Sequence, residues 1–272
     1  MATFDFNGKE IYYEEYGQGD PIVVLNGIMM SCPSWYAFID SLSANNRLIL
    51  FDMLDQGKSA KMEENFSFEI QADVLLALLD HLRIEKANLT GVSYGGIVSL
   101  RFAISYPERV KKMVLFDTTE YLGQWLADIG VAWMEASDDA KQYYYTSIPV
   151  IYSPEFYKNN MDWMNKRYGT LLNVFSNKAF IDSMNRLTIS MAKADMRDEI
   201  KNITAPTLIV SGREDYLIPM SEQERLVKGI PGAHWVIIPN SGHCSMYEQP
   251  EVYAAQIIGF INDPVDKYMI TA

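Results

Sequence analysis

Cysteine and histidine are scarce in this chain of 272 residues, which has two cysteines, Cys32 and Cys244, and three histidines. Two cysteines are too few for a disulfide scaffold, and neither lies at the spacing of a metal site. We therefore expect free thiols and no bound metal. Any chemistry that needs an imidazole has only three candidates.

Positive charge and long apolar runs are also lacking. Lys and Arg number 23 against 35 Asp and Glu, a net charge of −12, which offers no field for attracting nucleic acid or an anionic membrane. No apolar run approaches the roughly 18 residues of a membrane span, and residues 1–10 lack the pattern of a signal peptide. The sequence thus predicts a soluble, cytoplasmic protein with no nucleic-acid partner and no membrane insertion, and it carries no trace of oligomeric state.

The chain does have a regular alternation of short apolar runs and helical patterns. Such runs are typical of strands buried on both faces of a parallel sheet. An Asn7-Gly8 pair predicts a hairpin at the start of the chain, and helices are expected over 33–42, 67–82 and 97–106. The predicted sheet strands are 21–25, 47–51, 87–90, 112–116, 206–210 and 234–238. This alternation predicts an α/β fold with a mostly parallel central sheet and helices on both faces.

The alternation stops between residues 120 and 195, where the sequence is helix-like and rich in aromatic residues. We expect an inserted helical cap over 120–195. The core domain would then consist of residues 1–119 and 196–272, and its end, residues 263–272, is expected to be a loosely held tail.

A G-x-S-x-G pattern, Gly91-Val92-Ser93-Tyr94-Gly95, joins a predicted strand to a predicted helix. A serine at a sharp strand-to-helix turn needs glycines two residues before and after it, because a Cβ there would collide with the folded-back backbone. The turn exposes the Ser93 hydroxyl above the sheet, and the N-terminus of the helix is directed at it. Ser93 is the candidate nucleophile, and it needs a base.

His243 is the candidate base. It lies in a polar turn just after the strand at 234–238, so it would share the carboxyl edge of the sheet with Ser93. His81 lies in an amphipathic helix and His234 begins a strand, and both are expected to be structural.

The imidazole in turn needs an acid that fixes its tautomer. Asp215 follows the strand at 206–210 on the same edge and is the preferred candidate. Asp117, which follows the strand at 112–116, and Glu214 are the alternatives.

The chain order Ser93, Asp215, His243, with the G-x-x-D-x-x-x-P form of residues 212–219 and the inserted cap, resembles the α/β-hydrolase superfamily over essentially the whole chain. The resemblance implies the α/β-hydrolase fold. It also implies an oxyanion hole made from two backbone N–H groups, which fall here on Tyr94 and Ile28.

Two segments depart from the common pattern of that family. Many members have His-Gly where this chain has Asn26-Gly27, and Asp55 stands in the first glycine position of the D-x-x-G-x-G-x-S segment. Both departures are similar to the acyltransferase of rhamnolipid biosynthesis, a member that uses activated 3-hydroxyacyl groups. Haloalkane dehalogenases of this fold have aspartate at the nucleophile position, where Ser93 stands here.

These residues predict a serine hydrolase that cleaves a small-molecule ester or thioester through an acyl-enzyme, with no metal or organic cofactor. Its apolar pocket is expected to include Met29, Met30, Trp35 and Trp125. The alternatives are an acyltransferase that uses a 3-hydroxyacyl thioester, and a non-catalytic protein of the same fold that binds a small ligand.

Overall fold

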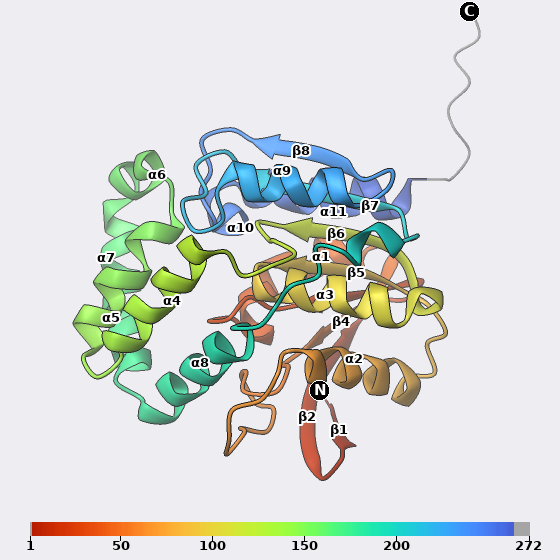
Figure 1. Ribbon diagram of the computed structural model, residues 1–272, viewed down its shortest axis with the longest axis horizontal. Helices are drawn as coiled ribbons and strands as arrows, with labels where there is room; N and C mark the ends of the chain where they lie inside the picture. Colours follow the sequence, from red (N-terminus) through yellow and green to blue (C-terminus); the bar gives the residue numbers. More distant parts are fainter. Residues whose placement is uncertain (1, 264–272) are drawn as a thin grey trace, which may run out of the picture.

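The computed structural model describes residues 2–263, so residues 264–272 of the expected tail lie outside the described residues. Within this range the centre of the molecule is an eight-stranded sheet in the order β1-β2-β4-β3-β5-β6-β7-β8 (Figure 1). The pairs β1/β2 and β2/β4 are antiparallel and the other neighbours are parallel. The strands are β1 (Ala2–Phe6), β2 (Lys9–Tyr16), β3 (Asp20–Leu25), β4 (Asn46–Phe51), β5 (Ala87–Val92), β6 (Val110–Phe116), β7 (Thr207–Gly212) and β8 (His234–Ile238).

Helices cover both faces of the sheet because its central strands are apolar on both sides. In β3, Val23 and Leu25 pack against α2 (Glu69–His81) and α3 (Tyr94–Ser105), a face that α9 (Met220–Gly229) also covers. The intervening residues Ile22 and Val24 face α11 (Pro250–Asn262). Successive side chains of a strand point to opposite faces, so each central strand contributes to both apolar layers.

Most elements agree with the sequence patterns, and the expected α/β fold is confirmed. The chain turns at Asn7 and Gly8, which have φ of 53° and 80°, as a tight hairpin requires. The stretch expected to be helical over 33–42 is helical, but in two parts: Cys32–Phe38 is a 3-10 helix and α1 (Ile39–Ser43) is an α-helix. The buried side chains of the 3-10 helix are Cys32, Trp35 and Phe38. Their spacing of three residues places them on one side of a 3-10 turn.

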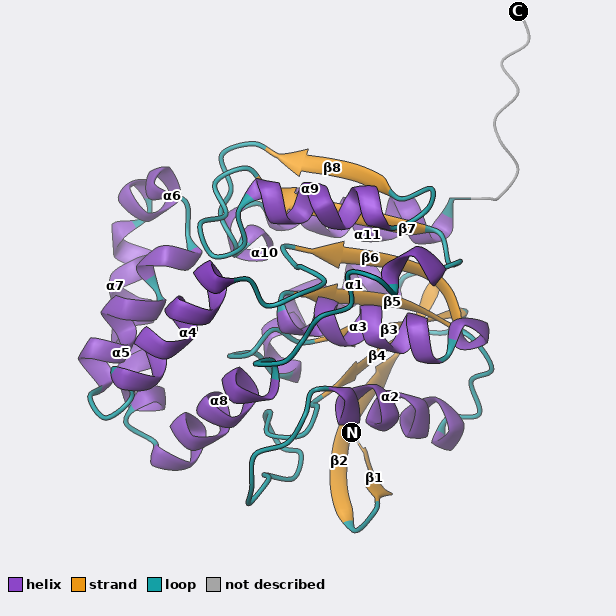
Figure 2. Ribbon diagram, viewed as in Figure 1, coloured by secondary structure: helices purple, strands orange, loops and turns teal. Residues whose placement is uncertain are grey.

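Five α-helices lie between β6 and β7 in the described chain: α4 (Gln124–Glu135), α5 (Ala140–Ser147), α6 (Pro154–Asn159), α7 (Met161–Phe175) and α8 (Lys178–Ser190). We call them the inserted helices. They gather at the end of the sheet toward which the parallel strands run (Figure 2). Many of their buried side chains form an apolar cluster, which includes Trp133, Tyr143, Tyr144, Met164 and Phe175 and also takes in Leu217 and Ile218 of the core. The domain boundaries at 120 and 195 stay a prediction.

Between residues 2 and 263 we find no helix that is both long enough and apolar enough to span a bilayer.

Candidate active site

Ser93 occupies a strained turn between β5 and α3. Its backbone has φ 53° and ψ −117°, a combination that residues with a Cβ rarely adopt. The Ser93 N–H donates to the carbonyl oxygen of Phe116 at 2.9 Å, and the Thr118 hydroxyl donates to the Ser93 carbonyl oxygen at 2.8 Å. Hydrogen bonds from both sides of the turn therefore hold Ser93 in this conformation.

The two glycines of the motif are required by close packing. A Cβ on Gly91 would lie 2.5 Å from the Gly95 carbonyl oxygen, and a Cβ on Gly95 would overlap the carbonyl group of Leu25. Gly95 thus lets α3 begin directly against the end of β3. The steric role that the pattern predicts for both glycines is confirmed.

His243 and Asp215 are in direct contact. Asp215 Oδ2 lies 2.9 Å from His243 Nδ1, and Asp215 Oδ1 accepts hydrogen bonds from the Leu217 and Ile218 amides at 2.9 Å each. The carboxylate is therefore fixed by its own loop and can only accept from the imidazole, which places the proton on Nδ1 and leaves Nε2 as the basic nitrogen.

Charge around the imidazole favours its protonated form. Burial lowers the pKa of His243, but the charge of Asp215, its hydrogen bond and the charges of Asp117 and Glu248 together outweigh the burial, so the pKa is raised above its ordinary value. An imidazole with this environment can take a proton from a hydroxyl and stabilise the cation that forms.

Asp117, one of the two alternative acids, lies near this pair but binds other groups. Asp117 Oδ1 accepts from the Gly212 amide at 2.7 Å, and its Oδ2 accepts from the Ser245 hydroxyl at 2.8 Å. Burial, with the neighbouring charge of Asp215, raises the pKa of Asp117 well above its ordinary range. Within residues 2–263 neither Asp117 nor Glu214 forms a hydrogen bond with the imidazole.

The other two histidines lie outside this group. His81 Nε2 is 3.1 Å from the Tyr13 hydroxyl, and the His81 ring stacks on Phe4. His234 is exposed at the start of β8 and lies against Phe260.

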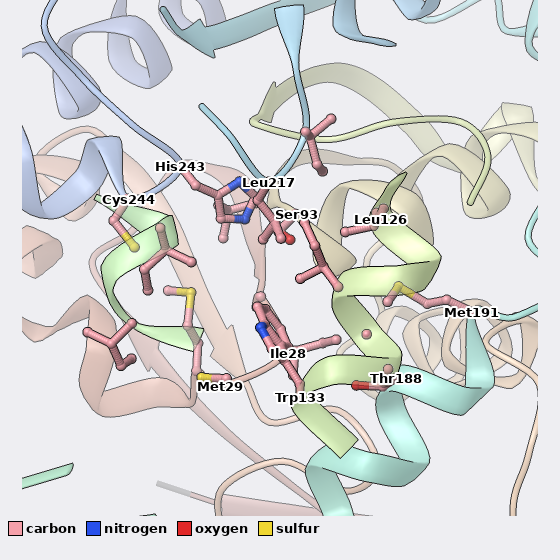
Figure 3. A pocket seen from close by; sticks show the side chains of 18 of the residues that line it. Ile28, Met29, Ser93, Leu126, Trp133, Thr188, Met191, Leu217, His243 and Cys244 are labelled. Carbon is pink, nitrogen blue, oxygen red and sulfur yellow. The ribbon is translucent and has the colours of Figure 1, made fainter. Parts of the chain in front are cut away.

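Ser93 and His243 line the same apolar cavity, whose volume is about 660 Å³. Figure 3 shows the Ser93 hydroxyl and the His243 ring close together, with Leu126, Trp133 and Thr188 of the inserted helices across from them. The cavity therefore lies between the carboxyl edge of the sheet and the inserted helices. Its wall includes Ile28, Met29, Met30, Ile97, Ile148, Ile151, Val174, Phe175 and Cys244.

Two of the four residues expected in the pocket do not line this cavity. Met29 and Met30 do. Trp35 is fully buried in the apolar layer between the sheet and α11. Its Nε1 donates to the Asn26 side-chain oxygen at 2.7 Å. Trp125 is 58% exposed, and its Nε1 donates to the Tyr216 carbonyl oxygen at 2.8 Å. Both indoles found a hydrogen-bond acceptor away from the cavity, which the sequence pattern does not predict.

The amides of Ile28 and Tyr94, expected to form an oxyanion hole, are available as donors. Tyr94 is the first residue of α3, where amides have no intrahelical acceptor. Ile28 lines the cavity after the end of β3. In the part of the chain that the structure describes, neither amide donates to another protein group.

Asn26 holds the loop that carries Ile28. Its side-chain nitrogen donates to the Phe51 carbonyl oxygen at 3.0 Å and to Gln56 Oε1 at 3.1 Å. Gln56 Nε2 in turn donates to the Gly27 carbonyl oxygen at 2.9 Å. The departure at Asn26 thus has a structural function, and Gln56, which sequence reasoning missed, belongs to the same network.

The departure at Asp55 joins the core to the inserted helices. Asp55 has φ 66°, a conformation that explains why glycine is common at this position. Its buried carboxylate binds Arg186 of α8 through two hydrogen bonds of 2.7 and 2.9 Å. Sequence reasoning missed Arg186, because its partner lies far away along the chain.

Comparisons with known proteins agree with this arrangement. A family model described as the alpha/beta hydrolase fold matches residues 20–250. The structure of MGS-M2, an alpha/beta hydrolase enzyme from a Medee basin deep-sea metagenome library, is 44% identical with a TM-score of 0.97, and the match covers 99% of this chain and 100% of that one. A thermophilic esterase from Thermogutta terrifontis is 26% identical with a TM-score of 0.83, over 95% and 96% of the two chains. A 2-hydroxy-6-oxononadienedioate/2-hydroxy-6-oxononatrienedioate hydrolase from Paraburkholderia phymatum is 29% identical over 269 residues, which are 92% of this chain and 90% of that protein.

Proposed function

Because the chain belongs to the alpha/beta hydrolase fold family, as its sequence patterns predicted, we propose that it is a serine hydrolase that cleaves a carboxylic ester or thioester with an apolar acyl group. The observation that carries this proposal is the 2.9 Å contact between Asp215 and His243 beside a serine in a strained turn. Named relatives of this chain are hydrolases, which supports the same class of chemistry.

The reaction would proceed in two halves on the same three side chains. His243 Nε2 removes the proton of Ser93, and the Ser93 oxygen attacks the carbonyl carbon of the substrate. The amides of Ile28 and Tyr94 would donate to the oxyanion that forms. His243 then protonates the leaving alcohol or thiol, and a water molecule activated by the same histidine releases the acid.

The apolar lining of the cavity favours a substrate with an apolar acyl group. Its wall consists mostly of Ile, Leu, Met, Val and aromatic side chains from both the core and the inserted helices. We propose that the inserted helices act as a cap, because they supply the side of the cavity that faces Ser93 and so exclude water from the reacting bond. The substrate would then be a small molecule, held mainly by apolar contacts.

A fluorophosphonate probe tests this proposal directly. We expect mass spectrometry to find the label on Ser93, and we expect H243Q to slow labelling strongly because the base is lost. Ser31 and Ser34 also line the cavity, so they are internal controls for adventitious reaction. A panel of p-nitrophenyl esters should be hydrolysed by the wild type and not by S93A. An unlabelled Ser93 and no ester turnover would favour the non-catalytic binding protein instead.

Acyl transfer is the second candidate, and the low polarity of the cavity favours it, because a hydroxy acid could compete there with water. Product analysis with and without an added 3-hydroxy acid separates the two reactions. We expect the free carboxylic acid to remain the main product. A new hydroxyacyl ester as the main product would identify a transferase.

A further inference from the structure

Arg167 is the exceptional residue of the cavity wall. It lies on α7, and apart from His243 it is the one basic side chain among the cavity-lining residues of the described chain, which include no Asp or Glu. An arginine stays protonated in proteins. The wall of an otherwise apolar cavity therefore carries a permanent positive charge.

Aromatic rings surround the Arg167 guanidinium. Its central carbon lies 4.7 Å from the ring centre of Tyr247, 5.2 Å from that of Trp163 and 5.9 Å from that of Tyr152. Such rings stabilise a cation through their faces, but they accept no N–H hydrogen bonds in the guanidinium plane. The rings thus stabilise the charge without supplying an anion.

No carboxylate within residues 2–263 forms an ion pair with Arg167, and its Nε is buried without a hydrogen-bond partner. Two other partly buried arginines of the described chain differ in having a carboxylate partner, although the Nε of Arg101 also has no hydrogen-bond partner. Arg186 binds Asp55, and Arg101 binds Glu199 through two hydrogen bonds. Because an anion stabilises a partly buried cation and the described chain supplies none here, we expect the anion to come from a ligand in the cavity.

The position of Arg167 connects it with the catalytic loop. Tyr247 belongs to α10 (Ser245–Glu248), which follows His243 almost directly, and both Tyr247 and Cys244 line the cavity. A ligand that reaches Arg167 therefore lies in the same cavity as a carbonyl group at Ser93. One substrate molecule can occupy both places.

Resting on the proposed function, we infer that Arg167 binds a carboxylate of the substrate, so that the natural substrates are monoanionic esters or thioesters. The planar guanidinium matches a carboxylate through two parallel N–H hydrogen bonds. The carboxylate belongs either to the acyl group or to the leaving group. In both cases Arg167 would bind the same chemical group. Arg167 is thus a specificity residue, and it takes no part in bond breaking.

Matched pairs of esters test this inference. For the acyl side, the mono-p-nitrophenyl esters of succinate, glutarate and adipate are compared with neutral p-nitrophenyl esters of the same length. For the leaving-group side, the butyrate ester of 4-hydroxybenzoate is compared with that of phenol. We expect the wild type to prefer the anionic member of at least one pair in kcat/KM. R167M should reduce that preference at least tenfold, mainly through KM, and R167K should restore part of it.

Lys166 supplies the control, because it is an exposed cation next to Arg167 on α7. K166M should keep the wild-type preference for the anionic ester, which excludes a general effect of net charge. If R167M lowered kcat/KM equally for the anionic and the neutral ester, the inference would be overturned and Arg167 would have only a packing role. A wild type that prefers the neutral member of every pair would overturn it too.

A binding measurement keeps this test independent of turnover. The half-anilides of succinate, glutarate and adipate are inert analogues, and calorimetry can compare them with neutral anilides of equal length. We expect R167M to raise the Kd of an anionic analogue at least tenfold more than that of its neutral counterpart. If no ester is hydrolysed, the proposed function fails while this measurement still decides on Arg167. If R167M does not fold, the Kd values of the anionic and the neutral analogue are compared for R167K and for the wild type. Equal affinities of the wild type for the two analogues would refute the inference.

Discussion

Polar side chains near the active site differ in their hydrogen bonds between the core and the inserted helices. In the core, Asp215 accepts hydrogen bonds from two amides and contacts His243, and Asn26 has three hydrogen bonds. In the inserted helices, the Trp133 Nε1 and Arg167 Nε atoms are buried without a partner, although both residues line the cavity. The core thus holds Asp215 and Asn26 through several hydrogen bonds each, whereas the inserted helices of the described chain place two unpaired N–H donors on residues that line the cavity.

The two regions are nevertheless joined by specific polar contacts. Asp55 of the core binds Arg186 of α8. Glu248 accepts hydrogen bonds from the amides of Ser153, just before α6, and Gly242, beside His243, at 3.1 and 3.0 Å. These contacts connect the position of the inserted helices to that of the catalytic loop.

The largest effect is expected within the core, from the comparison of two buried aspartates. D215N should lower kcat/KM by about 10⁴-fold, because an amide at this position would favour the wrong imidazole tautomer. D117N should lower it by less than about tenfold, because Asp117 does not bond the imidazole and an amide oxygen can still accept from Gly212. Steady-state kinetics on one p-nitrophenyl ester measures both. A larger loss in D117N than in D215N would make Asp117 the catalytic acid.

The next effect concerns the ion pair between the two regions. R186M leaves the fully buried Asp55 side chain without its cation, which should cost about 3–5 kcal/mol of unfolding free energy. The control is K178M on the same helix, whose pair with Asp182 is largely exposed and should contribute at most about 0.5 kcal/mol. Urea unfolding measures both variants, and hydrogen exchange shows whether α8 opens first. Equal stabilities of the two variants would show that this ion pair does not hold the regions together.

Sequence reasoning predicted the core well because core elements depend on local patterns. The apolar runs placed the central strands, and the spacing of Gly91 and Gly95 placed the turn at Ser93. Each of these features is readable within a few residues, since a strand buried on both faces is apolar throughout and a sharp turn requires glycine. The rule that parallel strands share one carboxyl edge placed Asp215 and its alternative Asp117 near His243, and the structure pairs His243 with Asp215.

Sequence reasoning failed where a side chain had a choice of partners. Trp35 and Trp125 were expected in the pocket, but each indole N–H bonds an oxygen elsewhere. The surroundings of Arg167 come from distant segments, since Tyr247 lies beyond the last strand of the sheet. No local pattern specifies such contacts, so the features that select a substrate were the least predictable.

A smaller effect is expected in the pH dependence of the site. Burial lowers the pKa of His243 and the charge of Asp215 raises it, with a net rise above the ordinary value of 6.5. Because only the neutral imidazole can act as the base, the rate of fluorophosphonate labelling should increase with pH through an apparent pKa above 6.5 and level off beyond it. A rate that is already constant from pH 6 upward would show that burial dominates over the carboxylate.

The smallest effect compares one exposed glycine in each region. Gly169 in α7 and Gly259 in α11 have open space where a Cβ would lie, so alanine should stabilise either helix by about 0.5–1 kcal/mol. Since polar contacts join the two regions, we expect a single cooperative unfolding transition that G169A and G259A shift by the same amount. Calorimetry measures both shifts. Two separate transitions, each moved by only one of the variants, would instead mean that the inserted helices unfold as a unit of their own, as the predicted domain boundaries at 120 and 195 imply.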